Sequence, residues 1–178
     1  MAARDDITAQ YVRERLDYDP ETGVFTWKNL ASTPENSGWV DSWNLRFEGK
    51  PAGSPGKRGH LCIALDNKKY YAHRLAWLIV YGLWPIDEID HIDGDKINNR
   101  ITNLRAATHS QNAHNRSKNN NNKSGFKGVT WQSHAQKWRA DIMVEGETLN
   151  LGYFCTKEEA AEAYADAAHR LHGEFAKT

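Results

Sequence analysis

The chain has 178 residues, enough for one ordinary domain or two to three small ones, and its 23 basic residues balance its 23 acidic residues. Its two cysteines, Cys62 and Cys155, lie in unrelated segments, which argues against a disulfide framework and a cysteine-based zinc site. The first residues are polar, and the longest apolar run, residues 75–83, is too short to span a bilayer. We therefore expect a soluble intracellular protein with no membrane partner.

Charged residues are unevenly distributed along the chain. Residues 96–140 contain nine Lys or Arg and three His but no Asp or Glu. A basic block in a neutral chain is typical of contact with a polyanion, although a solvated basic surface has the same composition.

The first part of the chain, residues 1–86, is predicted to mix helix and strand. A helix over residues 8–16 has Thr8 as its N-cap, and a strand follows at residues 24–27. Residues 31–59 carry many Gly, Pro and Ser and are predicted to form loops.

A β-hairpin and a helix are predicted next. Two strands, residues 61–65 and 68–72, flank Asp66-Asn67, which tolerate a positive φ. A helix over residues 73–81 follows and ends at a glycine. The residues predicted to face inward on this helix are Leu75, Leu78 and Ile79, with Trp77 as a further candidate.

The spacing of four polar residues then points to hydrolytic chemistry. Asp90-His91 is followed by Asn103, twelve residues after the histidine, and by Asn112 nine residues later. A strand, a tight Asp-Gly-Asp turn, a returning strand and a helix are predicted here, and together they can enclose one metal ion. Carboxylate and amide oxygens suit Mg²⁺ or Mn²⁺, and a neutral imidazole can take a proton from water. A base beside a hard metal is what phosphodiester hydrolysis requires.

This stretch, IDHIDGDKINNRITNLRAATHSQNAHN, resembles the HNH nuclease motif, or ββα-metal finger, and most resembles phage-type HNH homing endonucleases. The resemblance implies that Asp90 and Asn112 bind Mg²⁺ or Mn²⁺, that His91 deprotonates the attacking water and that Asn103 orients the imidazole. It also implies products with a 5′ phosphate and a 3′ hydroxyl. No zinc is expected, because the four-cysteine zinc site of some HNH subfamilies is missing. The preceding HRLAWLIVYGLWP also resembles the lead-in of phage HNH proteins.

Strand geometry raises one question about the motif. In an ideal strand Asp90 and His91 point to opposite faces, so both serve one site only if the strand ends or twists there. An EF-hand is a rival for the Asp-Gly-Asp turn, but no Glu closes a twelve-residue loop.

Other histidines are weighed beside the motif. His109 lies one helical turn before Asn112 and is a further candidate to face the metal, whereas His114 should point elsewhere. His60 and His73 are interpreted as structural histidines.

Basic residues around the motif are expected to contact DNA phosphates. The candidates are Arg105, Arg116 and Lys118. The Asn-rich run at residues 119–123 has no apolar anchor and is predicted to be a linker.

The last part of the chain is predicted to form three strands and one helix. Strands are expected at residues 124–131, 137–144 and 148–154, and Thr156 with Glu159 forms a capping box that starts the helix. Its apolar stripe comprises Ala160, Ala163, Tyr164, Ala167, Ala168 and Leu171.

The segments GFKGVTW, KWRADI, LGYF and EEAAEAYADAAHRLHG resemble the plant APETALA-type, ethylene-response-factor DNA-binding domain over residues 124–175. In that family the sheet face opposite the helix lies in the DNA major groove. The positions that match its contact residues are Lys127, Thr130, Gln132, Asp141, Met143, Thr148, Asn150 and Tyr153, and strand parity adds Arg139. The family has Arg or Trp at several of these positions, so its base specificity is not transferred.

An α+β fold is therefore expected. It comprises an N-terminal mixed α/β region (residues 1–86), a ββα-metal finger (87–118), the linker (119–123) and a three-stranded antiparallel sheet packed on one helix (124–178). The expected function is a metal-dependent HNH endonuclease of double-stranded DNA, a phage-type homing enzyme that nicks as a monomer inside the phage's host cell. The alternatives are a DNA-binding regulator with an inactive finger, and a dimeric restriction-type endonuclease that breaks both strands.

Overall fold

The computed structural model describes residues 6–115 and 121–178. The chain divides into two compact units, Met1–Ala106 (unit 1) and Ala107–Thr178 (unit 2), each with its own apolar core. Both units combine helices with small antiparallel sheets, which confirms the expected α+β class. The boundary between the units, after Ala106, lies inside the segment predicted to be the finger and near the end of its second strand, residues 104–107.

Unit 1 begins with a short helix and a two-stranded sheet. Helix α1 (Ala9–Arg13) starts as predicted, because the Thr8 side chain accepts a hydrogen bond from the Tyr11 N–H at 3.2 Å. It ends earlier than predicted, because the chain turns at Glu14 and then enters strand β1 (Leu16–Tyr18). This strand pairs with β2 (Phe25–Trp27).

The segment predicted to be all loop contains a helix, which corrects the expectation for residues 31–59. Helix α2 (Ser37–Phe47) packs aromatic rings against β2: the Trp43 centroid lies 5.2 Å from that of Trp27, and Phe47 lies 6.4 Å from the same ring. Trp43 and Phe47 are one turn apart, a spacing that the surrounding Gly, Ser and Asn residues obscure in the sequence.

The predicted hairpin is present in a three-stranded sheet. Strand β4 (Leu61–Leu65) pairs with β5 (Lys68–Tyr71) on one side and with β3 (Ser54–Pro55) on the other. Asp66 and Asn67 have φ values of 47° and 61°, as the two-residue turn requires.

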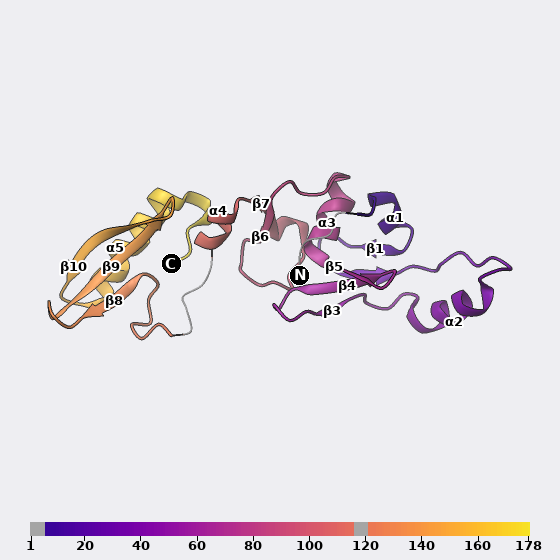
Figure 1. The fold of residues 1–178 in the computed structure, drawn as a ribbon, viewed down its shortest axis with the longest axis horizontal. Helices are drawn as coiled ribbons and strands as arrows, with labels where there is room; N and C mark the ends of the chain where they lie inside the picture. Colours follow the sequence, from indigo (N-terminus) through magenta and orange to yellow (C-terminus); the bar gives the residue numbers. More distant parts are fainter. Residues whose placement is uncertain (1–5, 116–120) are drawn as a thin grey trace. The chain divides into compact units, whose positions relative to one another are not determined.

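Helix α3 (Ala72–Tyr81) covers this sheet and supplies much of the core of unit 1 (Figure 1). Leu75 and Leu78 are buried, while Ile79 and Trp77 pack at the edge of the cluster. Gly82 ends the helix with φ 78°, as predicted. Among the residues that the structure describes, no helix is long and apolar enough to cross a membrane.

The finger segment adds two short strands to unit 1. Strand β6 (Glu88–His91) pairs with β7 (Leu104–Ala107), and the short helix η1 (Ile101–Asn103) precedes β7. Ile89 and Leu104 are each 5% exposed and join the core cluster of unit 1.

Unit 2 opens with a short helix. Helix α4 (His109–His114) begins at a capping box in which the Thr108 side chain accepts from the Gln111 N–H and the Gln111 side chain accepts from the Thr108 N–H. The predicted helix extended to Arg116, which lies outside the described residues.

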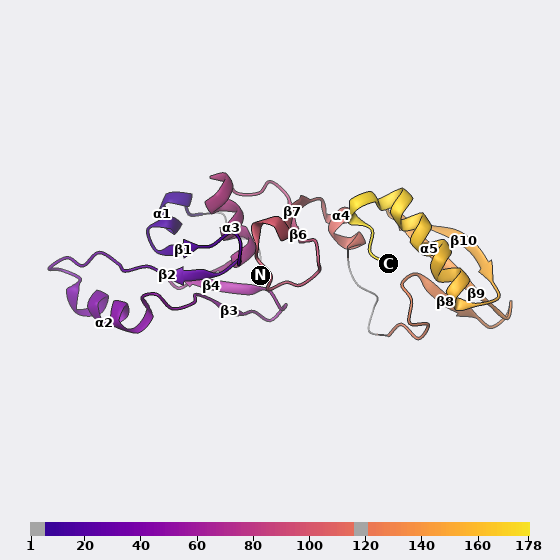
Figure 2. The ribbon, with the colours of Figure 1, turned by 180° about the vertical axis from the view of Figure 1, so that it is seen from behind.

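The rest of unit 2 is a sheet backed by one helix, as predicted (Figure 2). The strands β8 (Val129–Gln132), β9 (Lys137–Val144) and β10 (Glu147–Phe154) form an antiparallel sheet with β9 in the centre. Strand β8 begins later than the predicted residue 124, because residues 124–128 form bends and turns. Helix α5 (Lys157–His172) begins at the predicted capping box, and the short helix η2 (Gly173–Phe175) follows it.

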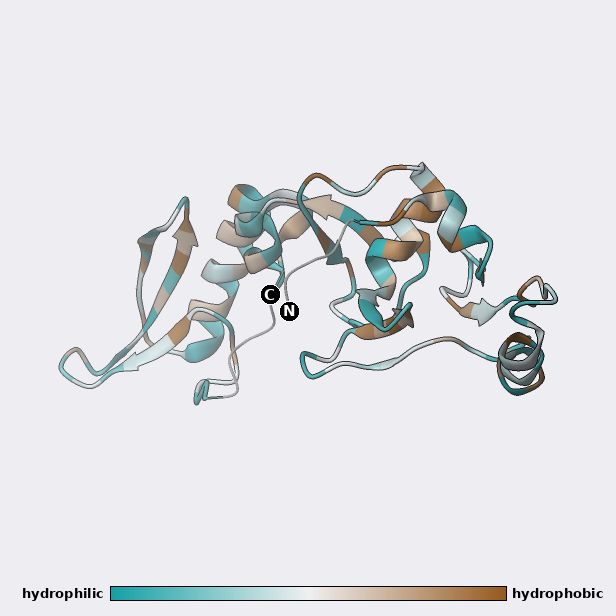
Figure 3. Ribbon diagram, turned by 45° about the vertical axis from the view of Figure 1, so that its right-hand side comes forward, coloured by the Kyte–Doolittle hydropathy of each residue, from teal (hydrophilic) through white to brown (hydrophobic). Residues whose placement is uncertain are grey.

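Helix α5 packs small residues against the sheet. Hydropathy alternates along its turns (Figure 3), and Ala160 and Ala168 are fully buried against the sheet that carries Ala140 and Ile142. Leu171, predicted to continue the apolar stripe, is 41% exposed, because it lies in the last turn beyond the end of this core.

Candidate functional site

The Asp90-His91 pair lies at the end of a strand that the core of unit 1 holds in place. Ile89 and, on the neighbouring strand, Leu104 insert into that core. Asp90 and His91 are consequently only 4% and 5% exposed. Burial of a carboxylate and an imidazole is costly unless each has polar partners, so their contacts define what the pair can do.

Asp90 is neutralised by an arginine on the adjacent strand. Arg105 donates hydrogen bonds from Nε at 2.9 Å and from Nη2 at 2.7 Å, both to Asp90 Oδ2. The two side chains are 13% and 5% exposed, so this is a buried, charge-assisted pair. The sequence suggested a phosphate contact for Arg105. In the structure Arg105 pairs with the carboxylate of Asp90 on the neighbouring strand, and its contact with phosphate stays a prediction.

His91 has a different partner, Asn99, on the loop after the Asp-Gly-Asp turn. His91 Nε2 lies 3.3 Å from Asn99 Oδ1, while Asn99 Nδ2 donates to the Ile97 carbonyl at 3.1 Å. Because the amide nitrogen has a carbonyl acceptor, the amide oxygen is the atom that faces the ring. An amide oxygen only accepts, so Nε2 carries the proton and Nδ1 keeps the lone pair.

The environment favours a neutral His91. Burial lowers the pKa of this imidazole, and the opposing influences are the hydrogen bond with Asn99 and the charges of Asp93, Asp90 and Asp95. Asn99 is itself fully buried, and the Tyr18 hydroxyl donates to its carbonyl at 2.7 Å. The ring is therefore held as an uncharged imidazole in one tautomer, which is the state that a general base requires.

Asn103, predicted to orient the imidazole, braces the turn instead. Its Nδ2 donates to Asp93 Oδ1 at 3.0 Å and to the Asn98 carbonyl at 2.9 Å, and its Oδ1 accepts from the Asp93 N–H at 3.1 Å. The structure thus gives the imidazole contact to Asn99, which the sequence reasoning missed. The Asn98-Asn99 pair was the only local signal, and nothing in it distinguished the two residues.

The turn after His91 is a closed polar network. Asp93 Oδ2 accepts from Asn98 Nδ2 at 2.6 Å, and Asp93 Oδ1 accepts from the Asp95 N–H at 2.7 Å. Burial raises the pKa of Asp93, but hydrogen bonds from Asn98, Asp95 and Asn103 outweigh it and hold that pKa below its usual value. The Gly94 N–H donates to the His91 carbonyl at 2.8 Å, so the network fixes the backbone of the histidine.

Arg105 thus pairs with Asp90, and Asn99 pairs with His91. His91 is the last residue of β6, so the strand ends at the point where alternation raised the question of a shared site. Asn112 and His109 lie on α4 in unit 2, and their predicted approach to the metal stays a prediction. Arg116 and Lys118, predicted to contact phosphates, lie outside the described residues.

The DNA-contact residues predicted on strands β8–β10 share the outer face of the sheet of unit 2. The register aligns Thr130, Arg139 and Tyr153 in one row across the strands, and aligns Asp141 with Asn150 in the next. The exposed members of the predicted set are Thr130, Met143, Thr148, Asn150 and Tyr153, and those of intermediate exposure are Gln132, Arg139 and Asp141. On this face Arg139 Nε donates to Asp141 Oδ1 at 2.7 Å.

Lys127 departs from this set. Its ammonium group donates to the carbonyls of His114 at 2.6 Å and Lys177 at 3.1 Å, and it lies 6.0 Å from the ring centroid of Tyr164. Burial lowers the pKa of this lysine. Lys127 thus binds backbone of its own unit rather than projecting from the sheet face, because it precedes β8 and turns back toward the helix side.

Comparison with known proteins identifies the family. Residues 70–114 match the family model described as HNH endonuclease. An uncharacterized HNH endonuclease, L560 of Acanthamoeba polyphaga mimivirus, is 37% identical over 156 residues, covering 86% of this chain and 74% of that protein. Protein 3.8 of Escherichia phage T7 is 36% identical over 89 residues, which cover 50% of this chain and 73% of that protein.

Among solved structures, that of the HNH homing endonuclease I-HmuI aligns with 97% of this chain and 91% of its own, at 20% identity and a TM-score of 0.41. The match to the mimivirus protein covers most of the length of both proteins. This chain therefore belongs to the HNH endonuclease family.

Proposed function

We propose that this endonuclease hydrolyses double-stranded DNA with the help of a divalent metal ion, Mg²⁺ or Mn²⁺, and that His91 is its general base. The observation that carries the proposal is the pairing of His91 Nε2 with Asn99 Oδ1 at 3.3 Å, at a buried position where desolvation lowers the pKa of the imidazole. This pairing leaves the Nδ1 lone pair as the proton acceptor.

The donor atoms of the motif fit a hard cation. Asp90 offers a buried carboxylate and Asn112 an amide oxygen, and the ligands that Mg²⁺ and Mn²⁺ prefer are oxygens of these kinds. When bound, such an ion supplies charge stabilisation at the scissile phosphate and at the leaving 3′ oxygen. Asp90 and Asn112 would hold it, and Arg105 keeps the Asp90 carboxylate fixed at the end of β6.

The proposed role of the protein residues is to accept one proton from the attacking water. His91 Nδ1 takes a proton from water, the hydroxide oxygen bonds to phosphorus, and the bond from phosphorus to the 3′ oxygen breaks. Asn99 stabilises the imidazolium that forms, because its oxygen already accepts the Nε2 proton. The network around Asp93 and Asn103 fixes the histidine backbone, so little reorganisation accompanies the step.

We further propose that the two predicted modules divide the work, with the finger (residues 87–118) cutting and residues 124–178 reading DNA. The basic block at residues 96–140 and the outer face of the β8–β10 sheet support this division. The resemblance of that sheet and helix to the APETALA-type domain favours the major groove as its target. A chain with one Asp90-His91 motif is proposed to act as a monomer that nicks one strand at a specific site, as a homing endonuclease does.

A plasmid assay tests this function. Supercoiled plasmid incubated with the protein and Mg²⁺ should become nicked circles, and EDTA should stop the reaction. His91→Ala should slow cleavage by about 10²–10⁴-fold, the loss typical of a general base, while DNA affinity is retained. His134→Ala, on the exposed turn between β8 and β9, is the matched control and should cleave normally. Cleavage that survives EDTA or is unchanged in His91→Ala would contradict the proposal.

A further inference from the structure

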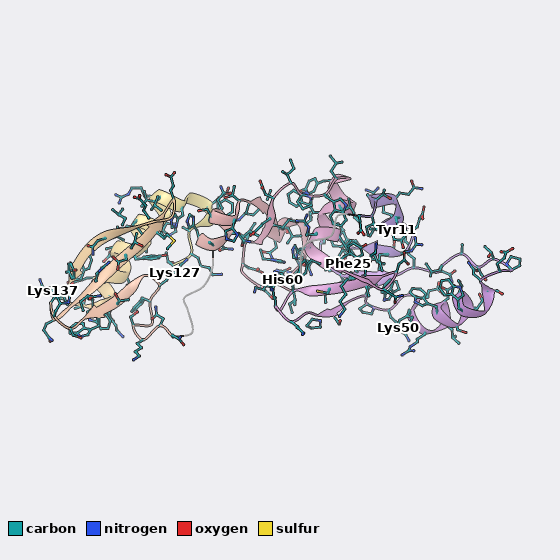
Figure 4. All side chains as sticks on the ribbon, in the orientation of Figure 1. Tyr11, Phe25, Lys50, His60, Lys127 and Lys137 are labelled. Carbon is teal, nitrogen blue, oxygen red and sulfur yellow. The ribbon has the colours of Figure 1, made fainter. Side chains whose placement is uncertain are left out.

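Three histidines that are far apart in the sequence meet in unit 1, and one of them is the proposed base. His60 precedes β4 (Figure 4), His73 lies in the first turn of α3 and His91 ends β6. Their ring centroids are separated by 5.0 Å (His60–His73), 5.1 Å (His73–His91) and 5.8 Å (His60–His91). One ring nitrogen from each histidine lies within 4.8 Å of one from each of the others.

Two of these rings carry polar atoms that the protein leaves unsatisfied. The Nδ1 atoms of His60 and His73 are buried and have no hydrogen-bond partner among the residues that the structure describes. His73 is 6% exposed, so this atom has lost its water without a replacement, which is unfavourable unless a ligand completes it. The ring of Tyr71 stacks on that of His73 with 5.4 Å between centroids and 17° between planes, and so holds it in place.

Both rings are also in the protonation state that binds metals. Burial lowers the pKa of His60 to about 4, with smaller contributions from Lys96, His91 and Arg58. Burial likewise places the pKa of His73 well below its usual value. At neutral pH each ring is therefore uncharged and offers a nitrogen lone pair.

We propose that His60, His73 and His91 form a binding site for a transition-metal ion of the Zn²⁺ class, separate from the oxygen-ligand centre at Asp90. Three imidazole nitrogens suit Zn²⁺, Cu²⁺ or Ni²⁺ and are poor ligands for Mg²⁺. Tetrahedral Zn²⁺ with bonds of about 2.0–2.1 Å needs nitrogens about 3.4 Å apart, which small ring rotations can reach from the observed cluster. His60 is partly exposed and leaves a route to solvent for the ion and for a fourth, water ligand.

Occupancy of this site would prevent His91 from acting as a base, a consequence that rests on the proposed function. A neutral imidazole has one nitrogen with a lone pair and one that carries a proton. If the ion binds Nδ1, the lone pair is used; if it binds Nε2, the proton must reside on Nδ1. In either case no lone pair remains to accept a proton from water, so a Zn²⁺-class ion inhibits cleavage that Mg²⁺ supports.

Binding is measured first, on the full chain and without DNA. Calorimetry with Zn²⁺, and the visible absorption of bound Co²⁺ as its surrogate, should show one site per chain. His60→Gln and His73→Gln should each weaken that site at least about tenfold. Circular dichroism reports whether each variant folds. If the variant of the buried His73 does not fold, the variant of the partly exposed His60 still decides the test.

Two variants serve as matched controls for binding. His172→Gln removes another histidine with an unpartnered buried Nδ1, whose ring stacks on that of His114 at 3.6 Å between centroids. Asn112→Ala alters the proposed oxygen-ligand centre from helix α4 and leaves the Asp90–Arg105 pair intact. Both should keep wild-type Zn²⁺ affinity. The proposal is overturned if wild-type protein binds no Zn²⁺, if both cluster variants bind it normally, or if binding is lost in a control variant instead.

Inhibition is measured second, as the ratio of cleavage rates with and without Zn²⁺ at constant Mg²⁺, taken within each variant. This ratio should be far below one for wild-type protein and for His172→Gln, and much closer to one for His60→Gln. If Zn²⁺ leaves the wild-type cleavage rate unchanged, the inference that the bound ion prevents His91 from acting as a base is overturned. If the protein cleaves no DNA at all, the proposed function fails, while the binding measurement still decides the metal site.

Discussion

The finger strands of unit 1 and the sheet of unit 2 reach stability by different routes. Strands β6 and β7 have four residues each and contribute only a few apolar side chains to a core, so the loop between them is held by the hydrogen bonds of Asp93, Asn99 and Asn103. The sheet of unit 2 has two strands of eight residues whose inner face packs on α5. Polar contacts thus position the chemistry, and apolar packing holds the proposed DNA-reading surface.

The largest effect on stability is expected where the finger buries charge. Asp90→Ala leaves the 13%-exposed Arg105 without its carboxylate, which should lower the free energy of unfolding of unit 1 by about 3–5 kcal/mol. Urea denaturation followed by tryptophan fluorescence measures it. The double variant with Arg105→Leu should recover much of the loss, and a loss below about 1 kcal/mol would show that the pair behaves like a surface ion pair.

The next effect should be confined to unit 2. Gly128 has φ 71°, and a Cβ there would lie 2.2 Å from the ring of Tyr164. Gly128→Ala should therefore destabilise unit 2 by about 2–4 kcal/mol through backbone strain and overpacking. Hydrogen exchange should show faster opening of β8–β10 and unchanged protection in β4–β5, whereas equal losses in both sheets would contradict separate cores. Gly146→Ala, where a Cβ meets nothing within 4 Å, is the control for positive φ alone.

A smaller effect, on rate rather than stability, is expected at Asn99. Asn99→Ala removes the acceptor for His91 Nε2 and should slow Mg²⁺-dependent cleavage by about 10–100-fold, the range typical of residues that orient a functional imidazole. The contact with Asn99 raises the pKa of His91, so its loss should lower that pKa and move the acid limb of the pH–rate profile to lower pH. An unshifted acid limb would assign Asn99 a purely structural role.

Features that depend on residues close together in the chain could be predicted from the sequence. The Thr8 N-cap, the Asp66-Asn67 turn and the Thr156-Glu159 capping box depend on neighbouring residues, and the structure confirms them. Helix α2 was missed because its apolar face becomes evident only when Trp43 and Phe47 meet Trp27, a contact made across the fold.

The site could be predicted in its residue types but not in its pairings. Spacing selected Asp90, His91 and Asn103, yet which amide faces the imidazole depends on the path of the loop, and that path places Asn99 there. The same limit applies to the histidine cluster, since no local pattern connects His60 with its partners. Long cationic side chains are harder still, because Arg105 and Lys127 each reach a partner that strand parity does not specify.

The tautomer of His91 is the most direct test of this account. Nitrogen-15 correlation spectra of the metal-free protein at neutral pH report which ring nitrogen carries the proton, and comparison with His91→Ala assigns the signals. We predict a protonated Nε2 and an unprotonated Nδ1, with the Nε2 signature weakened in Asn99→Ala. A proton on Nδ1 in the wild-type protein would contradict the account, because the nitrogen proposed to accept the proton of water would already carry one.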